Sequence, residues 1–270
     1  MKMFITRLAP TPSGFLHSGN LLNFRLIQHL KKLTGAKIYL RIDDLDSARI
    51  RDEYIEDIFR HLEWMKIDVD GGPSDVQDFK ENFSQQLKLN TYKKGLTLLE
   101  QRGATLYQCR CSRKDIRQAS PSGIYPGTCR KLNLSSSEAP VVRFETSAHT
   151  QLEQEHGDFV LWRRNLEPAY HLASVLDDLS LGVNFVIRGE DLEASTRVHK
   201  VLNSSFSPEQ APHYFHHPLV SSSSGEKLSK SQLNSAQQHF YSSGASLKQL
   251  EEQWDFPKLA ELLEDELKSL

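Results

Sequence analysis

The sequence has few cysteines, little net charge and no long hydrophobic run. It holds 3 cysteines in 270 residues, so a framework of several disulfides is excluded. The formal net charge of −2 excludes an overall basic surface, and any contact with nucleic acid must therefore be local. No apolar run approaches the roughly 20 residues that span a bilayer. The N-terminus lacks the hydrophobic region of a signal peptide, so we expect a cytoplasmic protein without membrane partners.

The hydrophobic pattern alternates between strands and helices. This alternation favours an α/β fold with a Rossmann-like, doubly wound parallel sheet. Strands are expected at 2–8, 37–42, 159–162 and 183–188, with the parallel pattern resuming at 159. Helices are expected at 21–33, 51–66, 85–102, 169–181, 193–203 and 259–270.

The segment from Tyr107 to about Glu155 differs in composition from the rest of the chain, because it holds all three cysteines and a run of serines. We interpret it as an insertion between two halves of a nucleotide-binding fold. The predicted organisation is 1–106 for the first half, 107–158 for the insertion, 159–232 for the second half and 233–270 for a short helical C-terminal segment.

Two distant segments favour an ATP site. In the first, Gly14 and Gly19 flank His17 where a predicted strand leads into a helix. Glycines let the backbone approach phosphates, and the helix N-terminus offers N–H groups to anions. The second, Lys227-Leu228-Ser229-Lys230-Ser231, places two lysines on a loop, where they can neutralise charge on a leaving pyrophosphate. The alternatives are an ordinary turn histidine and a solvated loop.

In these and further segments the sequence resembles class I aminoacyl-tRNA synthetases, specifically their glutamate-activating branch. The strings that carry the resemblance are collinear between residues 7 and 231. They are Arg7-Leu8-Ala9-Pro10-Thr11-Pro12-Ser13-Gly14, Leu16-His17-Ser18-Gly19, Leu40-Arg41-Ile42-Asp43-Asp44-Leu45-Asp46, Ala169-Tyr170-His171-Leu172-Ala173, Val175-Leu176-Asp177-Asp178, Val186-Ile187-Arg188-Gly189-Glu190-Asp191 and Lys227-Leu228-Ser229-Lys230-Ser231.

The chain length restricts the resemblance to one group of proteins within this branch. Full-length members of the branch continue into a helical domain that reads the anticodon, and this sequence has no room for one. It therefore resembles the short paralogues, which activate glutamate with ATP and attach it to the queuosine base of tRNA(Asp). The resemblance implies ATP, Mg²⁺ and Zn²⁺ as substrate and cofactors. It implies glutamate and the anticodon loop of queuosine-containing tRNA(Asp) as partners, whereas the oligomeric state is not indicated.

The resemblance also implies the roles of individual residues. The expected catalytic residues are His17, Lys227 and Lys230, and the expected ATP-binding residues are His17, Gly19, Asn20 and Lys230. The expected glutamate-binding residues are Arg7, Ala9, Thr11, Asp43, Tyr170 and Arg188. An arginine fork can bind both oxygens of a substrate carboxylate, which suits Arg7 and Arg188. Alternatively, Arg188 pairs with Glu190 or Asp191 and Tyr170 serves only packing.

Asp43 departs from the family pattern, which has glutamate at this position to receive the substrate ammonium. Aspartate is one methylene shorter, so its charge lies roughly 1.5 Å further back on an unchanged backbone. A misplacement near 1 Å can cost on the order of 100-fold in rate. Three alternatives follow: the backbone shifts, a water bridges the gap, or the substrate is another amino acid.

The cysteines suit a metal site. Three thiolates are typical Zn²⁺ ligands and leave one tetrahedral position. By resemblance, the metal ligands are Cys109, Cys111, Tyr125 and Cys129. His149 or His156 could replace Tyr125 on chemical grounds, and three reduced thiols without a metal are the simpler alternative. Four protein ligands would make the site structural.

Basic residues near the cysteines could guide tRNA phosphates or simply be solvated. They are Arg110, Arg113, Lys114, Arg117, Arg130, Lys131, Arg163 and Arg164. Two other readings of the whole chain stay open. One is an adenylate-forming ligase with another amino acid or acceptor, and the other is a non-catalytic RNA-binding relative.

Overall fold

The computed structural model describes residues 3–219, 240–242 and 246–270. The chain divides into two compact units: Met1–Leu87, Leu181–Glu193 and Pro212–Leu270 form the first, and Lys88–Ser180 and Ala194–Ala211 form the second. The segment that contains Lys227 and Lys230 lies outside the described residues. Within the described ranges, no helix combines the length and the apolar character needed to cross a membrane.

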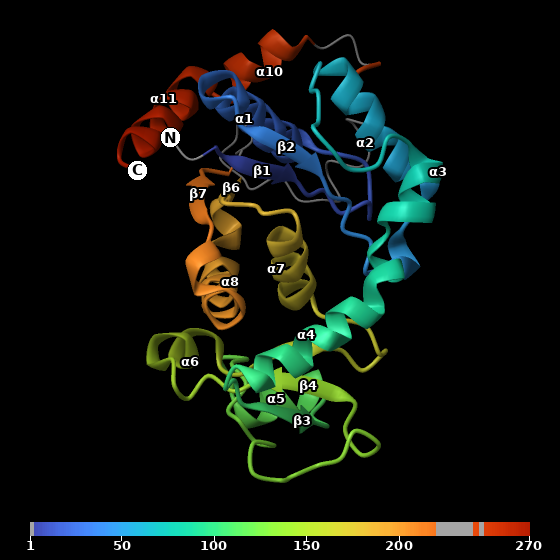
Figure 1. Cartoon of the computed structure of the whole chain (residues 1–270), viewed down its shortest axis with the longest axis vertical. Helices are drawn as coiled ribbons and strands as arrows, with labels where there is room; N and C mark the ends of the chain where they lie inside the picture. The colour runs from blue at the N-terminus through green and yellow to red at the C-terminus, as the bar shows by residue number, and fades with distance from the viewer. Residues whose placement is uncertain (1–2, 220–239, 243–245) are drawn as a thin grey trace. The chain divides into compact units, whose positions relative to one another are not determined.

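Parallel strands form the centre of the first unit (Figure 1). Strand β1 (Ile5–Leu8) pairs with β2 (Lys37–Leu40), and β6 (Phe185–Gly189) pairs with β7 (His213–His217). Asn184 connects the two pairs. Its side chain accepts from the Ile5 N–H and its own N–H donates to the Ile5 carbonyl, both at 2.9 Å. The predicted parallel α/β arrangement is therefore confirmed in this unit.

Helices cover these strands because each has one apolar face. Helix α1 (Ser18–Thr34) connects β1 to β2 and buries Leu22, Leu26 and Leu30. It ends at Gly35, whose φ of 70° is left-handed and suits glycine. The other helices of this unit are α2 (Asp52–Trp64), α3 (Val76–Asp78), α10 (Leu247–Gln253) and α11 (Phe256–Lys268), with shorter turns at Ser47–Arg49, Phe79–Phe83, Gln85–Lys88 and Glu190–Leu192.

The last two helices pack on α1 (Figure 1). Trp254, between α10 and α11, donates from its indole Nε1 to the Ser18 Oγ at 2.7 Å. Trp254, Leu259 and Leu263 belong to the same buried core as Leu22 of α1. The C-terminal helices therefore complete the core of the first unit.

The strands of the second unit form an antiparallel sheet. Its order is β3 (Leu106–Cys109), β4 (Val141–Phe144) and β5 (Phe159–Trp162). The prediction that 159–162 resumes the parallel sheet is therefore wrong. A run of four apolar residues predicts a buried strand, but its direction depends on the partner that the connecting segment brings beside it.

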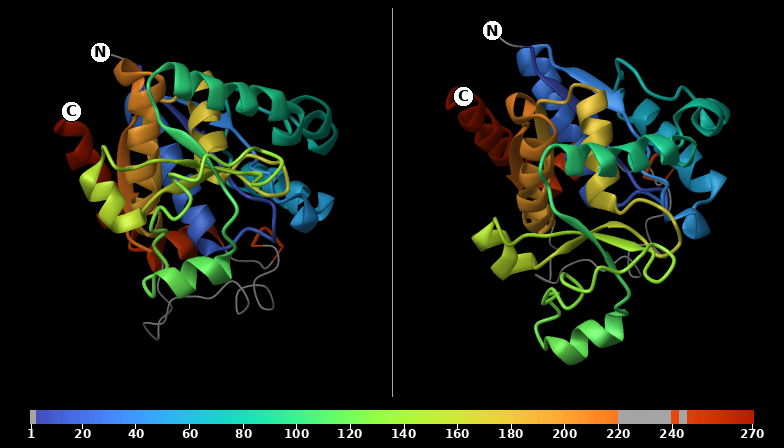
Figure 2. Two further views of the ribbon diagram at one scale, coloured as in Figure 1. Left: turned by 90° about the horizontal axis from the view of Figure 1, so that it is seen from below. Right: turned by 60° about the horizontal axis from the view of Figure 1, so that its bottom comes forward.

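The second unit also contains α4 (Leu89–Gln101), α5 (Arg113–Ala119), α6 (Thr150–His156), α7 (Tyr170–Ser180), α8 (Glu193–Phe206) and the turn Pro208–Gln210. Figure 2 shows α5 and the loop that follows it extending away from the three-stranded sheet. Helices α4 and α7 approach closely, since a Cβ on Gly95 would lie 2.5 Å from the Leu176 Cδ1. Any side chain at Gly95 would have to displace Leu176.

Candidate functional site

The predicted phosphate-binding residues meet at the N-terminus of α1. His17 is the residue before the helix and has an extended backbone. Its N–H donates to the Asn20 Oδ1 at 3.1 Å, and its carbonyl accepts from the Asn20 N–H at 2.8 Å. A Cβ on Gly19 would lie 3.2 Å from the His17 ring, so the imidazole lies over the first helical turn. The backbone N–H groups and the imidazole therefore face one place where an anion could bind.

Two of the predicted glutamate residues of the first unit lie near the carboxyl ends of parallel strands. Arg7 lies in β1 and Arg188 in β6, and both are buried. The guanidinium carbon of Arg188 lies 4.8 Å from the centre of the Tyr214 ring, a contact that the sequence did not indicate. Ligands of open parallel sheets bind beyond the carboxyl ends of the strands, and each of these two arginines is the last residue but one of its strand.

Asp43 is held by a buried arginine two residues earlier. Arg41 donates from Nε to the Asp43 Oδ1 at 2.7 Å and from Nη2 to Oδ2 at 3.0 Å. The Gln85 side chain lies 3.4 Å from the same Oδ1. The Asp43 N–H donates to the Pro10 carbonyl at 2.9 Å, which joins the loop after β2 to the loop that carries Ala9 and Thr11. Position 43 is thus built around the shorter carboxylate.

Tyr170 begins α7 in the second unit and is 40% exposed. Its ring centre lies 5.3 Å from that of His171 and 5.4 Å from that of His199. The exposure argues against a role in packing alone.

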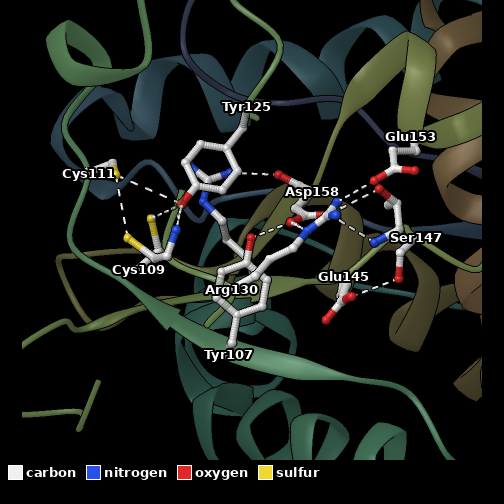
Figure 3. Close-up of polar contacts among 12 residues, drawn as sticks. Tyr107, Cys109, Cys111, Tyr125, Arg130, Glu145, Ser147, Glu153 and Asp158 are labelled. Carbon is white, nitrogen blue, oxygen red and sulfur yellow. Dashed lines mark hydrogen bonds and ion pairs between the residues drawn. The ribbon is translucent and has the colours of Figure 1, made fainter. Parts of the chain in front are cut away.

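The three cysteine sulfurs lie together in the second unit, within 4.8 Å of one another (Figure 3). The Tyr125 hydroxyl lies 3.4 Å from the Cys109 Sγ and 3.8 Å from the Cys111 Sγ, and it accepts from the Cys129 N–H at 2.9 Å. Among the described residues, no imidazole or carboxylate joins this group. The donor set of three sulfurs and one phenol oxygen around one point fits a tetrahedral Zn²⁺.

The pKa values of Cys111 and Cys129 are shifted in opposite directions. Burial raises the pKa of Cys111 to about 11. Burial also acts on Cys129, but hydrogen bonds from Tyr125 and the Arg110 backbone outweigh it and lower the pKa of that thiol. Cys129 therefore ionises more readily than Cys111, and a bound cation would favour the thiolate at all three positions.

One contact fixes the ring of Tyr125 and another fixes its backbone. The Arg143 guanidinium stacks on it from β4. Gly157 pairs with Tyr125 in an isolated parallel bridge, and a Cβ at Gly157 would lie 2.3 Å from the Tyr125 carbonyl oxygen.

A buried carboxylate network beside the cysteines was not predicted. Asp158 accepts from the Arg130 Nε and Nη2, both at 2.6 Å, from the Thr146 N–H at 2.9 Å and from the Tyr107 hydroxyl (Figure 3). Burial alone would raise the pKa of Asp158, but the bonds from Arg130, Tyr107 and Thr146 outweigh it and lower that pKa. Asp158 directly precedes a strand, a position that gives no sequence signal for its partners.

Two of the residues predicted to form a basic surface are instead paired with carboxylates. Arg130 binds Asp158 and Glu153, and Arg163 binds Glu167 at 2.5 Å. The expectation that Arg130 contributes to a solvated basic face is therefore wrong, because two carboxylates hold its guanidinium. The residues that stay exposed are Arg110, Arg113, Lys114, Arg117, Lys131 and Arg164.

Comparison with known proteins shows the family of the chain. Residues 3–127 and 131–251 match the family of class I tRNA synthetases (E and Q), catalytic domain. The chain is 34% identical over 251 residues to a glutamyl-Q tRNA(Asp) synthetase of Nitratidesulfovibrio vulgaris, covering 83% of this chain and 76% of that protein. It is 33% identical over 279 residues to a glutamyl-Q tRNA(Asp) synthetase of Rhodobacter capsulatus, covering 90% and 96%.

The fold is similar to the crystal structure of glutamate-tRNA synthetase from Elizabethkingia anophelis, with a TM-score of 0.66 at 22% identity. This alignment covers 86% of the chain described here and 53% of the other. The chain therefore spans about half the length of the solved structures that it matches.

Proposed function

Because the chain belongs to the catalytic-domain family of class I tRNA synthetases for glutamate and glutamine, and is therefore a ligase, we propose that it activates glutamate with ATP. The adenylate would then pass glutamate to the queuosine base of tRNA(Asp). The relatives in Nitratidesulfovibrio vulgaris and Rhodobacter capsulatus, which match over most of their own length, carry names that support this acceptor.

The observation that carries the proposal is the arrangement around α1 in the first unit. The imidazole of His17 lies over the helix N-terminus. The buried guanidinium groups of Arg7 and Arg188 belong to β1 and β6, strands of the two parallel pairs that Asn184 connects. The carboxyl ends of these strands and the N-terminus of α1 thus offer donors for phosphates and forks for carboxylates.

In the proposed reaction, the substrate carboxylate attacks the α-phosphorus of ATP and pyrophosphate leaves. A hydroxyl of the acceptor nucleoside then attacks the acyl carbon, loses its proton and displaces AMP. The chain's residues act by binding and orienting the reactants, since little covalent work falls to the protein. Lys227 and Lys230 are proposed to neutralise the leaving pyrophosphate.

Zn²⁺ bound by Cys109, Cys111, Cys129 and Tyr125 would be structural, because all four positions are filled by the chain. The exposed basic residues of α5, Arg113, Lys114 and Arg117, are proposed to contact tRNA phosphates.

The test has two stages. ATP–pyrophosphate exchange is measured with each amino acid, and exchange that depends on glutamate is expected. Labelled glutamate is then incubated with ATP and with tRNA(Asp) that contains or lacks queuosine, and label is expected only on the modified tRNA. Exchange with another amino acid but none with glutamate would contradict the amino-acid assignment.

Asp43 supports a second candidate, an adenylate-forming ligase for another amino acid. Its carboxylate is shorter than the family's glutamate and is engaged by both nitrogens of the Arg41 fork. The panel of amino acids in the exchange assay decides between the two candidates.

A further inference from the structure

Helix α2 is joined to the phosphate-binding turn by a buried hydrogen bond. The Leu16 N–H donates to the Asp57 Oδ2 at 2.8 Å. Leu16 directly precedes His17, and Asp57 is only 1% exposed. A second contact between the same elements is the edge-to-face pair of Phe15 and Tyr54, with ring centres 4.9 Å apart. The turn is therefore fixed from α2 at two successive residues.

His61 lies one helical turn after Asp57 and is fully buried. Its Nδ1 lies 2.8 Å from the Asp57 carbonyl oxygen and 3.4 Å from the Asp57 Oδ1. A carbonyl oxygen only accepts, so Nδ1 carries a hydrogen and points it toward Asp57. The ring of His61 is enclosed by Trp64, Phe240 and Tyr241, with centre distances of 6.2, 6.1 and 5.0 Å.

A carboxylate at a fully buried helix position is costly unless it is well bonded. An apolar residue would pack there at lower cost, but it would leave the Leu16 amide buried without its acceptor. The bonds between His17 and Asn20 are internal to the turn and do not fix its place in the unit. The bond to Asp57 does fix that place, which gives the carboxylate a purpose beyond packing.

We propose that Asp57, oriented by His61, is a positioning residue for ATP. It holds the Leu16 amide so that the His17 imidazole and the N-terminus of α1 face the phosphates before ATP binds. Preorganisation of this kind lowers the cost of binding, because the turn loses no freedom when the ligand arrives. The inference rests on the proposed function, since it requires ATP to bind at this turn.

The experiment compares Asp57→Ala with Asp70→Ala. Asp70 is a matched control, because its Oδ2 also accepts from a backbone N–H at 2.8 Å, that of Ile38 in β2. Asp57→Asn keeps an oxygen acceptor and serves as the rescue. The readouts are the KM for ATP and for glutamate in pyrophosphate exchange, the Kd for ATP by calorimetry, and thermal unfolding.

We expect Asp57→Ala to raise the KM and Kd for ATP by about 10-fold and to change the KM for glutamate by less than about twofold. Asp57→Asn is expected to recover most of the ATP affinity, and Asp70→Ala to lower the unfolding temperature without changing either constant. Equal losses for ATP and glutamate, or unchanged ATP constants in folded Asp57→Ala, would overturn the proposal.

Should Asp57→Ala not fold, His61→Phe decides the question, since it keeps the aromatic volume and removes the Nδ1–H donor. A folded His61→Phe with the parent's Kd for ATP would also overturn the proposal. A parent protein that binds ATP but exchanges pyrophosphate with no amino acid would refute the proposed function alone. In that case the calorimetric Kd values still test the role of Asp57.

Discussion

The Arg143 guanidinium carbon lies 3.8 Å from the centre of the Tyr125 ring, and its Nη1 donates to the Asp158 carbonyl at 2.7 Å. One side chain thus connects the phenol beside the cysteines to the backbone at the start of β5. The stack fixes the plane of the ring and hence the position of its hydroxyl among the sulfurs. Because Arg143 is almost fully buried, this contact is shielded from water.

Removing that support should weaken metal binding without touching a ligand. Arg143→Met is expected to lower the affinity for Zn²⁺ by about 10- to 100-fold, as loss of an orienting partner does at other metal sites. Competition with a chromophoric chelator measures the change. Arg117→Met on the exposed face of α5 is the control and should retain the parent's affinity; equal affinities for both variants would refute the role of Arg143.

The fourth ligand can be identified by metal content. Protein purified without chelators is expected to hold about one equivalent of zinc. Tyr125→Phe keeps the ring and removes the oxygen, so it should lose zinc during dialysis, whereas His149→Ala and His156→Ala should keep it. Zinc retained by Tyr125→Phe and lost from a histidine variant would assign the ligand to that histidine. Less than about half an equivalent in the parent would favour reduced thiols without a metal.

Asp158 should make the second unit sensitive to acid. Its pKa is lowered by Arg130, Tyr107 and Thr146 against the effect of burial. The stability that it provides is therefore present above the ordinary aspartate pKa of about 3.9 and is lost as the pH falls through the lower folded value. Asp158→Asn should cost about 3 kcal/mol at pH 7, because Arg130 loses its buried charge partner.

The difference between the parent and Asp158→Asn should shrink as the pH falls below about 3.9, because the unfolded parent then takes up a proton, and it should vanish only below the lower pKa of folded Asp158. Urea unfolding at a series of pH values measures this, together with amide hydrogen exchange of β4. A constant difference from pH 7 to pH 3 would show that the effect of the substitution is unrelated to ionisation.

Gly157 should tolerate no side chain. Its φ is 62°, and a Cβ would lie 2.3 Å from the Tyr125 carbonyl oxygen. Gly123→Ala is a matched control, because Gly123 also has a positive φ of 78° but a Cβ there would meet no atom within 4 Å. Both variants should lose about 1 kcal/mol from backbone strain. Gly157→Ala should lose clearly more in thermal unfolding, and equal losses would contradict the close approach.

Lengthening Asp43 should impair the enzyme, although it restores the family's residue. Arg41 binds both Asp43 oxygens in a buried setting, so a longer side chain must displace the fork. We expect Asp43→Glu to lower kcat/KM for glutamate in pyrophosphate exchange by about 10-fold. Asp46→Glu, which pairs with exposed Arg49, is the control. Faster exchange in Asp43→Glu would show that the site is built for the longer carboxylate.

Periodicity in the sequence predicted most elements of the first unit. Leu22, Leu26 and Leu30 fall on one helical face, and that face is the buried side of α1. The direction of β5 could not be predicted in the same way, because a run of four apolar residues predicts a buried strand but not the direction of its partner. Its partner β4 is fixed by contacts that no local pattern records.

In the candidate sites, too, residues with a local sequence signal were predicted and residues defined by distant partners were not. The three cysteines were predicted as a group because their spacing is short, and the structure brings their sulfurs together. Arg130 was assigned to the surface because a sequence shows charge but not the carboxylate that meets it. Asp57 and Asp158 were missed for the same reason, since their partners are distant in the chain and their roles depend on burial.

Trp254 lies beyond residue 251, where the family match ends, and its indole donates to the hydroxyl of Ser18, which lies inside the matched range. A fragment trimmed to the matched range would lose Trp254 and all of α11, exposing the side of α1 that they cover. The helix that presents His17 would then have an open flank. We therefore expect a fragment that ends at residue 251 to be less stable than one that continues through Lys268.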